Sequence, residues 1–355
     1  MIPELGVIEG YVGRPWRHED RKQVLSRLRE MGYAWFHYAP KADAWLRRRW
    51  RERHPDAVLA ELSDLSAHCR GLGMRFGVGL SPYELYRDFS GDAMRAFVDK
   101  VRSLDAIGID DLAILFDDTR GDVPDLAARE AEIVHAAIAN TRASRVLMCP
   151  TYYSDDRMLD VVFGERPRGY LQDLGRRLDP AIGVYWTGEE ICTREFSPGH
   201  LTRVAEALGR KPTLWDNYPV NDGSKASSFL HLRAFENRPA ELAELTSGHA
   251  VNPMKQAALS VLPLATLPMS YKLGKQYDPD KALHASLNAT CGPQISAMIQ
   301  ADLPLFQDIG LAQLTPEQVA HLKARYLPFR DQACVGEILL WLDGEYVFDP
   351  DCLTD

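Results

Sequence analysis

The sequence predicts a (β/α)8 TIM barrel followed by a small C-terminal helical region. Short apolar runs rich in β-forming residues alternate with stretches whose apolar residues recur at helical spacing, and this alternation is typical of a parallel sheet. There are eight such runs, at residues 5–9, 34–39, 74–80, 112–116, 145–149, 182–186, 213–215 and, more weakly, 249–251. They lie within the first 270 residues, close to the about 250 residues typical of this barrel.

The stretches between the runs have helical features. Val24, Leu25 and Leu28 are spaced to form one apolar stripe on a helix. Gly32 and Gly73 precede the second and third runs, where a helix that ends in a left-handed residue favours glycine. Each run is therefore expected to follow a helix that packs against the sheet.

The alternation stops near residue 270, so we expect a catalytic barrel over residues 1–270 and a helical region over residues 271–355. Within the second part, Thr315 followed by Pro316 predicts a helix start. A hydroxyl there caps the first turn, and proline suits the first helical position. An apolar segment at 338–342 then precedes an acidic terminus.

Composition and charge exclude several classes of function. The 355 residues carry a formal net charge of -9, which argues against nucleic acid as a partner because binding a polyanion needs a basic surface. The six cysteines show no Cys-x-x-Cys spacing, which excludes zinc-ribbon and thioredoxin-type sites. No run reaches the roughly 18 apolar residues of a membrane helix, and the N-terminus lacks the basic and apolar regions of a secretory signal. We therefore expect a cytoplasmic enzyme with no membrane partner.

The sharpest candidate for chemistry is the pair Asp117 and Asp118, which directly follows the run 112–116. Barrel enzymes build their sites at the C-terminal ends of the strands. Two carboxylates this close cannot both ionise freely, so one is expected to hold a proton near neutral pH and act as a general acid. Adjacent residues reach a substrate from one side only, whereas the two carboxylates of common glycosidases flank the scissile bond. The pair therefore suits a reaction whose nucleophile belongs to the substrate.

Polar and aromatic residues also follow other runs. Trp215 and Asn217 end the seventh run, with Asp222 close behind. An indole face stacks on a sugar ring, and amides and carboxylates bind hydroxyls. Lys41, Tyr153 and Asn252 follow the second, fifth and eighth runs.

Two other interpretations of these residues stay open. A metal-dependent barrel hydrolase would use Asp117, Asp118 and Asp216 as oxygen ligands, and a non-catalytic sugar-binding scaffold would use the same barrel without the reaction. Hydrolytic metal barrels usually show a His-x-His pair near the first strand, and residues 5–10 contain no histidine. We therefore expect neither a metal nor another cofactor, and we expect His37, inside an apolar run, to be an interior histidine.

The chain resembles the family 84 glycoside hydrolases, which comprise protein O-GlcNAcases and related bacterial β-N-acetylglucosaminidases. The resemblance rests on ordered segments that span the first 270 residues. These are residues 6–16, 38–41, 50–52, 115–118, 149–151, 185–188, 215–217, 221–222 and 252–253.

The resemblance implies a barrel that removes β-linked N-acetylglucosamine (GlcNAc) with retention, through an oxazoline formed by the substrate's own acetamido group. Asp117 would hold the acetamido N–H, and Asp118 would protonate the leaving oxygen and later activate water. Tyr153 and Asn217 would help to position the acetamido group, and Trp215 would form a wall of the pocket. The positions that would bind sugar hydroxyls are Gly10, Lys41, Asp222 and Asn252. The implied partner is a GlcNAc-bearing protein or glycoside, and because helices like those expected at the C-terminus pair two subunits in some relatives, a homodimer is a further expectation.

Overall fold

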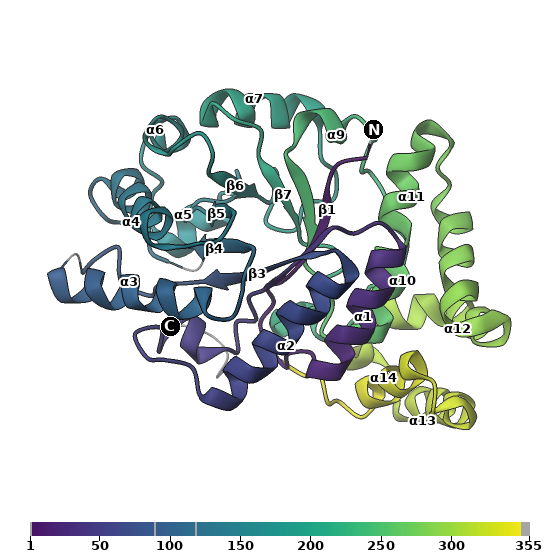
Figure 1. The fold of residues 1–355 in the computed structure, drawn as a ribbon. Helices are drawn as coiled ribbons and strands as arrows, with labels where there is room; N and C mark the ends of the chain where they lie inside the picture. The colour runs from purple at the N-terminus through teal and green to yellow at the C-terminus, as the bar shows by residue number, and fades with distance from the viewer. Residues whose placement is uncertain (1, 89, 118, 349–355) are drawn as a thin grey trace.

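The computed structural model describes residues 2–88, 90–117 and 119–348, and its centre is a closed barrel of parallel strands in chain order (Figure 1). The strands are β1 (Leu5–Glu9), β2 (Trp35–Tyr38), β3 (Arg75–Leu80), β4 (Asp111–Leu115), β5 (Arg145–Cys149), β6 (Gly183–Trp186), β7 (Thr213–Asp216) and β8 (Gly248–Val251). β8 pairs with β1 and closes the barrel. The predicted fold class is confirmed, and each predicted run coincides with its strand to within one residue at either end.

Helices surround the barrel on its outside, as Figure 1 shows. Those between the strands are α1 (His18–Glu30), α2 (Asp56–Leu72), α3 (Gly91–Asp105), α4 (Leu126–Asn140), α5 (Met158–Phe163), α6 (Tyr170–Arg177), α7 (Pro198–Leu208), α8 (Gly223–Ala226) and α9 (Leu242–Leu245). After β8 come α10 (Ala257–Leu264), α11 (Thr266–Leu273), α12 (Pro279–Leu303), α13 (Pro316–Tyr326) and α14 (Ala333–Leu342). The predicted stripe of α1 is buried, with Val24, Leu25 and Leu28 facing the core.

Side chains alternate between the barrel interior and the helical layer, as the pleat of a strand requires. Ile8, Leu115 and Trp215 belong to an inner cluster that fills the barrel. Leu112, Ile114 and their equivalents on other strands pack outward against the helices.

The interior histidine predicted at position 37 is confirmed. His37 is fully buried and its two ring nitrogens bond across the barrel, Nδ1 to the Tyr185 hydroxyl at 2.7 Å and Nε2 to Asp111 Oδ2 at 3.1 Å. Burial lowers the pKa of His37, although its hydrogen bond to Asp111 opposes the shift. A Cβ at Gly77 would lie 2.5 Å from the His37 ring, so β3 has glycine where the imidazole crosses the interior.

The C-terminal helices build a second apolar core beside α10 (Figure 1). Thr315 caps α13 in a capping box with Gln318, which confirms the predicted helix start. This core also includes Leu230 and Met254, so the expected division at residue 270 stays a prediction. Within the described ranges, no helix is long and apolar enough to cross a membrane.

Candidate active site

The candidate site residues occupy the next inward position after each strand. Inward side chains alternate along a strand, and Ile8, Ala39, Leu115, Trp215 and Ala250 all belong to the inner cluster. Two residues further on, at the carboxyl ends of the strands, the chain has Gly10, Lys41, Asp117, Asn217 and Asn252. The pleat therefore makes these five positions face inward, and because the strands are parallel they all lie at the same end of the barrel.

Asp117 and Lys41 form a buried ion pair at this end. Lys41 Nζ donates to Asp117 Oδ2, and the two side chains are only 4% and 11% exposed. The other carboxylate oxygen, Oδ1, is buried and accepts no hydrogen bond from the described residues. Asp117 thus has one oxygen fixed by a cation and one free to accept a donor from a ligand. Asp118 lies outside the described residues.

Gly10, Asn217 and Asn252 form a hydrogen-bonded group with Trp215. The Trp215 indole N–H and the Asn252 side-chain amide both donate to Asn217 Oδ1, each at 3.0 Å. Asn252 Oδ1 in turn accepts the Gly10 N–H at 3.2 Å, and the Asn217 amide donates to the Ile191 carbonyl at 2.8 Å. These bonds fix both amides and the indole relative to the ends of β1, β7 and β8.

Trp215 lies directly against the backbone of Gly10. A Cβ at position 10 would stand 2.4 Å from Cζ2 of the indole, closer than real Cβ contacts allow. Tyr185 also contacts the indole, and its ring meets Trp215 edge-on with centroids 5.2 Å apart. Gly10 and Tyr185 therefore both restrict the position of the indole.

We expect Gly10→Ala to raise KM by about ten-fold, because the added methyl displaces the indole and overpacking of this kind destabilises a fitted arrangement by about 1–3 kcal/mol. Steady-state kinetics on a β-linked GlcNAc glycoside, the substrate that the family resemblance implies, measure the effect. Gly71→Ala is the matched control, since a Cβ at that helical position meets nothing within 4 Å. Equal KM values for the two variants would contradict the assigned role of the Trp215 contact.

Asp222 and Tyr153 border the same end of the barrel. Asp222 Oδ2 accepts the Val12 N–H at 2.8 Å and so ties the loop after β7 to the loop after β1. Tyr153 is half-buried against the inner cluster, and its carbonyl accepts the Thr187 N–H at 2.9 Å. All predicted site residues that the structure describes therefore lie at the carboxyl ends of strands.

Asp216 does not belong to this group. The metal-dependent alternative, which used Asp216 as a ligand together with Asp117, was therefore wrong about this residue. It alternates outward from Trp215 and is fully buried. Both its oxygens bond to Arg238, and Oδ2 also faces His249 Nε2 at 3.1 Å. Burial alone would raise the pKa of Asp216, but the charge of Arg238 and the bonds from His249 and Arg238 outweigh it and lower the pKa.

The sequence interpretation did not single out Glu130, a fully buried carboxyl on α4. Glu130 accepts hydrogen bonds from the backbone N–H and hydroxyl of Thr151, at 3.0 and 2.7 Å. The signal was present, since Glu130 lies on the stripe that also contains Ala127, Val134 and Ala137, the buried face of the helix. An acid on an apolar stripe is rarely buried without function or partners.

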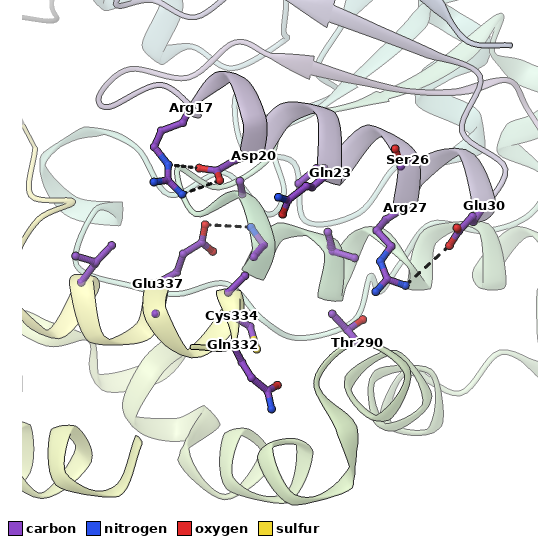
Figure 2. A pocket seen from close by; sticks show the side chains of 17 residues that line it. Arg17, Asp20, Gln23, Ser26, Arg27, Glu30, Thr290, Gln332, Cys334 and Glu337 are labelled. Atoms are coloured by element: carbon purple, nitrogen blue, oxygen red, sulfur yellow. Dashed lines mark hydrogen bonds and ion pairs between the residues drawn. The ribbon is translucent and has the colours of Figure 1, made fainter. Parts of the chain in front are cut away.

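A separate pocket of about 690 Å³ lies outside the barrel, between α1, α10, α12 and α14 (Figure 2). None of the predicted site residues that the structure describes lines it. Its lining includes Glu337, whose carboxylate accepts the backbone N–H groups of Ala258 and Leu259 at 3.1 and 2.9 Å. Glu337 thereby caps the first turn of α10.

A comparison with protein families decides the classification. The β-N-acetylglucosaminidase family model matches residues 5–303 of this chain. The chain belongs to that family. The matched region contains every strand of the barrel and every predicted site residue, and the resemblance to the family 84 enzymes is confirmed.

Individual relatives agree with this membership. The protein O-GlcNAcases of Rattus norvegicus and Mus musculus are each 28% identical over 279 residues, which cover 75% of this chain and 30% of the relative. The chain thus spans less than a third of their length. A mutant of the O-GlcNAc hydrolase of Thermobaculum terrenum has a similar structure, with a TM-score of 0.78 at 26% identity, covering 97% of this chain and 81% of that one.

Proposed function

We propose that this family member is a retaining β-N-acetylglucosaminidase of the O-GlcNAcase type, which hydrolyses terminal β-linked GlcNAc by substrate assistance. The observation that carries the proposal is the hydrogen bonding of the two carboxylate oxygens of Asp117. One of its oxygens is held by Lys41, and the other is a buried acceptor without a partner among the described residues. An acetamido N–H is a donor of the kind that such an acceptor needs.

In the proposed reaction the substrate supplies the nucleophile. Asp117 accepts the acetamido N–H and stabilises the positive charge that grows on nitrogen as the carbonyl oxygen attacks the anomeric carbon. The bond to the leaving oxygen breaks as Asp118 donates its proton, and an oxazolinium ion forms, which becomes the neutral oxazoline when Asp117 takes its N–H proton. Asp118 then removes a proton from the water that opens the oxazoline, so the configuration is retained.

The remaining residues are proposed to bind the sugar. Trp215 would form one wall, and its fixed position follows from its contacts with Gly10 and Asn217. Asn217 and Tyr153 would hold the acetamido group. The residues proposed to bind the hydroxyls are Gly10, Lys41, Asp222 and Asn252.

A series of chromogenic GlcNAc glycosides tests both the activity and the mechanism. The unmodified glycoside should be hydrolysed, which a non-catalytic scaffold would not do. Replacing the acetyl group by mono-, di- and trifluoroacetyl should lower kcat by about ten-fold or more at each step, because fluorine makes the carbonyl oxygen a poorer nucleophile. A flat response would exclude the substrate's carbonyl as the attacking group.

We propose a GlcNAc-bearing protein or a glycoside as the physiological substrate, with no cofactor. The similarity to protein O-GlcNAcases and to an O-GlcNAc hydrolase supports the first of these. A cytoplasmic location and a homodimer remain predictions.

A further inference from the structure

A buried carboxyl behind the active site joins the two loops that carry Asp117 and Tyr153. Glu130 is fully buried on α4. Its Oε1 holds the backbone and hydroxyl of Thr151, the residue two positions before Tyr153, and its Oε2 accepts the hydroxyl of Tyr170 from α6. Among the described residues Glu130 makes no ion pair, so only neutral donors stabilise its charge.

The contact continues from Thr151 to the peptide of Asp117. Thr151 Oγ1 lies 2.8 Å from Thr119 Oγ1, and Thr119 Oγ1 lies 2.8 Å from the Phe116 carbonyl oxygen. That carbonyl belongs to the peptide bond whose nitrogen is that of Asp117. Three short contacts thus connect the buried carboxyl to the backbone of the residue proposed to hold the acetamido group.

These contacts cannot all be hydrogen bonds when Glu130 is ionised. Each hydroxyl has one proton, so the two threonines supply two protons for three contacts. With an ionised carboxylate, Thr151 donates to Glu130. Thr119 then donates to Thr151, because two hydroxyl oxygens 2.8 Å apart repel each other when no proton lies between them. Of the donors that the structure describes, the Phe116 carbonyl then keeps the Thr119 backbone N–H, at 3.2 Å.

Protonation of Glu130 reverses the direction of the chain. The carboxyl O–H donates to Thr151, Thr151 donates to Thr119, and Thr119 donates to the Phe116 carbonyl. All three contacts are then hydrogen bonds, and the Thr151 backbone N–H and the Tyr170 hydroxyl keep their acceptors. Protonation therefore adds a hydrogen bond to the Asp117 peptide without moving an atom other than hydrogen.

We propose that Glu130 is a positioning residue for Asp117, and that its protonation state sets whether the hydroxyls of Thr151 and Thr119 donate toward the Asp117 peptide or away from it. The inference rests on the proposed function in one respect, the role of Asp117 in holding the substrate's acetamido group. The protonated state is the one that fixes the peptide.

Burial makes Glu130 change its protonation state near neutral pH. Burial raises the pKa of Glu130 to about 7, although the hydrogen bonds from Tyr170 and Thr151 oppose the shift. The nearby titratable groups on α6 and after β5 are phenols that stay neutral there, because burial raises the pKa of Tyr170 well above its usual value and that of Tyr152 to about 12. The Cys149 thiol at the end of β5 lies close to Tyr170.

Charged groups of the neighbouring helices bond elsewhere. Lys100 on α3 donates to the Glu52 carbonyl at 2.9 Å, and Asp105 accepts from Thr141 at 2.7 Å. Arg129, next to Glu130 on α4, donates to the Tyr86 carbonyl at 2.9 Å. None of these three groups bonds to Glu130 or Thr151, so the protonation that reverses the chain of hydroxyls is assigned to Glu130.

Glu130→Gln should remove the step in the pH profile of kcat that comes from Glu130, while the step that comes from the general acid remains. The Gln carbonyl accepts both donors of Thr151 and its amide donates to Tyr170, which locks the hydroxyls in the direction of the ionised state. In the unaltered enzyme we expect kcat to fall by about 3- to 10-fold as pH rises through about 7, because Glu130 ionises and one hydrogen bond to the Asp117 peptide is lost. In the Gln variant this fall should be missing, and kcat should match that of the unaltered enzyme with Glu130 ionised, with KM within about two-fold.

Thr119→Val tests the same chain from its other end. It removes the hydroxyl that donates to the Phe116 carbonyl, so it should give the same low kcat without the fall that comes from Glu130. Because both substitutions break one chain, the double variant should be no slower than either single one. Additive losses would contradict a shared chain.

Glu337→Gln is the matched control. Glu337 is also held by backbone N–H groups, and burial also raises its pKa to about 7, but it lies at the pocket outside the barrel (Figure 2). This variant should keep the pH profile of kcat unchanged. If it too loses the fall near pH 7, a general effect on folding, and not positioning, accounts for the result.

The amide resonance of Asp117 provides a readout that needs no substrate. Its shift should titrate with a midpoint near pH 7 in the enzyme with 15N-labelled aspartate and in Glu337→Gln, and should stay constant in Glu130→Gln and Thr119→Val. A constant shift in the unaltered protein would overturn the positioning role. A titrating shift together with no hydrolysis of any GlcNAc glycoside would instead overturn the proposed function and leave the positioning role standing.

Discussion

Asp117→Asn is expected to lower kcat by about 10²- to 10³-fold, the loss typical when a group aimed at developing charge is removed. The asparagine side chain is neutral, so it cannot balance the positive charge that grows on the acetamido nitrogen of the substrate. The substitution also removes the carboxylate that pairs with Lys41 inside the barrel. KM should change much less than kcat, because the lost interaction strengthens in the transition state.

Two comparisons separate this effect from others. Asp302→Asn removes another buried carboxylate, which pairs with Arg325 and Tyr326 among the C-terminal helices, and it should leave kcat unchanged. A glycoside with a dinitrophenol leaving group needs no protonation, so it should restore much of the rate of Asp118→Asn and little of that of Asp117→Asn. Restoration of both rates to the same extent would reject the separate roles assigned to the two acids.

The part of the site that the sequence predicts is the part that strand periodicity controls. Asp117 follows the inward residue Leu115 by two positions, and Asn252 follows Ala250 in the same way. Because side chains alternate along a strand, both residues face inward, and an error of one residue in the predicted strand end does not change this. Hydrophobic runs locate strand ends well because buried parallel strands are continuously apolar. One end of a barrel then collects the residues from every strand.

The unpredicted part consists of partners that only the folded chain brings together. Arg238 lies 22 residues after Asp216 and Glu130 lies 21 residues before Thr151, and no local pattern joins either pair. The metal-dependent alternative used Asp216 as a ligand, since it lies at the end of the seventh run. Alternation along the strand places Asp216 on the outer face of the barrel. Its partner there is the guanidinium of Arg238, which belongs to a loop without regular secondary structure.

Arg238→Met should lower the free energy of unfolding by about 3–5 kcal/mol, the usual effect of removing one partner of a buried ion pair. The guanidinium and Asp216 are 4% and 0% exposed and share two hydrogen bonds of 2.7 and 2.9 Å. Arg238 also donates to the backbone carbonyls of Thr193, Arg194 and Glu236, which lose a donor as well. Chemical denaturation monitored by tryptophan fluorescence measures the loss.

Arg233→Met is the matched control, since Arg233 makes an equally close two-bond pair with Asp308, at 2.6 and 2.7 Å, with side chains 36% and 53% exposed. Exposed pairs contribute about 0–1 kcal/mol, so burial and not bond length should decide the difference. Comparable losses in the two variants would contradict this.

The pH dependence identifies the charge responsible for the loss in Arg238→Met. The folded protein lowers the pKa of Asp216 below its ordinary value of 3.8, so this carboxylate contributes stability above that pH and loses it as pH falls through the lowered pKa. Without Arg238 the buried carboxylate is destabilised and its pKa rises. The difference between the unaltered protein and Arg238→Met should therefore be largest near neutral pH and shrink toward pH 4, where Asp216 becomes neutral in the variant. Adding Asp216→Asn to Arg238→Met should recover part of the loss at neutral pH, because it removes the uncompensated charge while His249 keeps an acceptor.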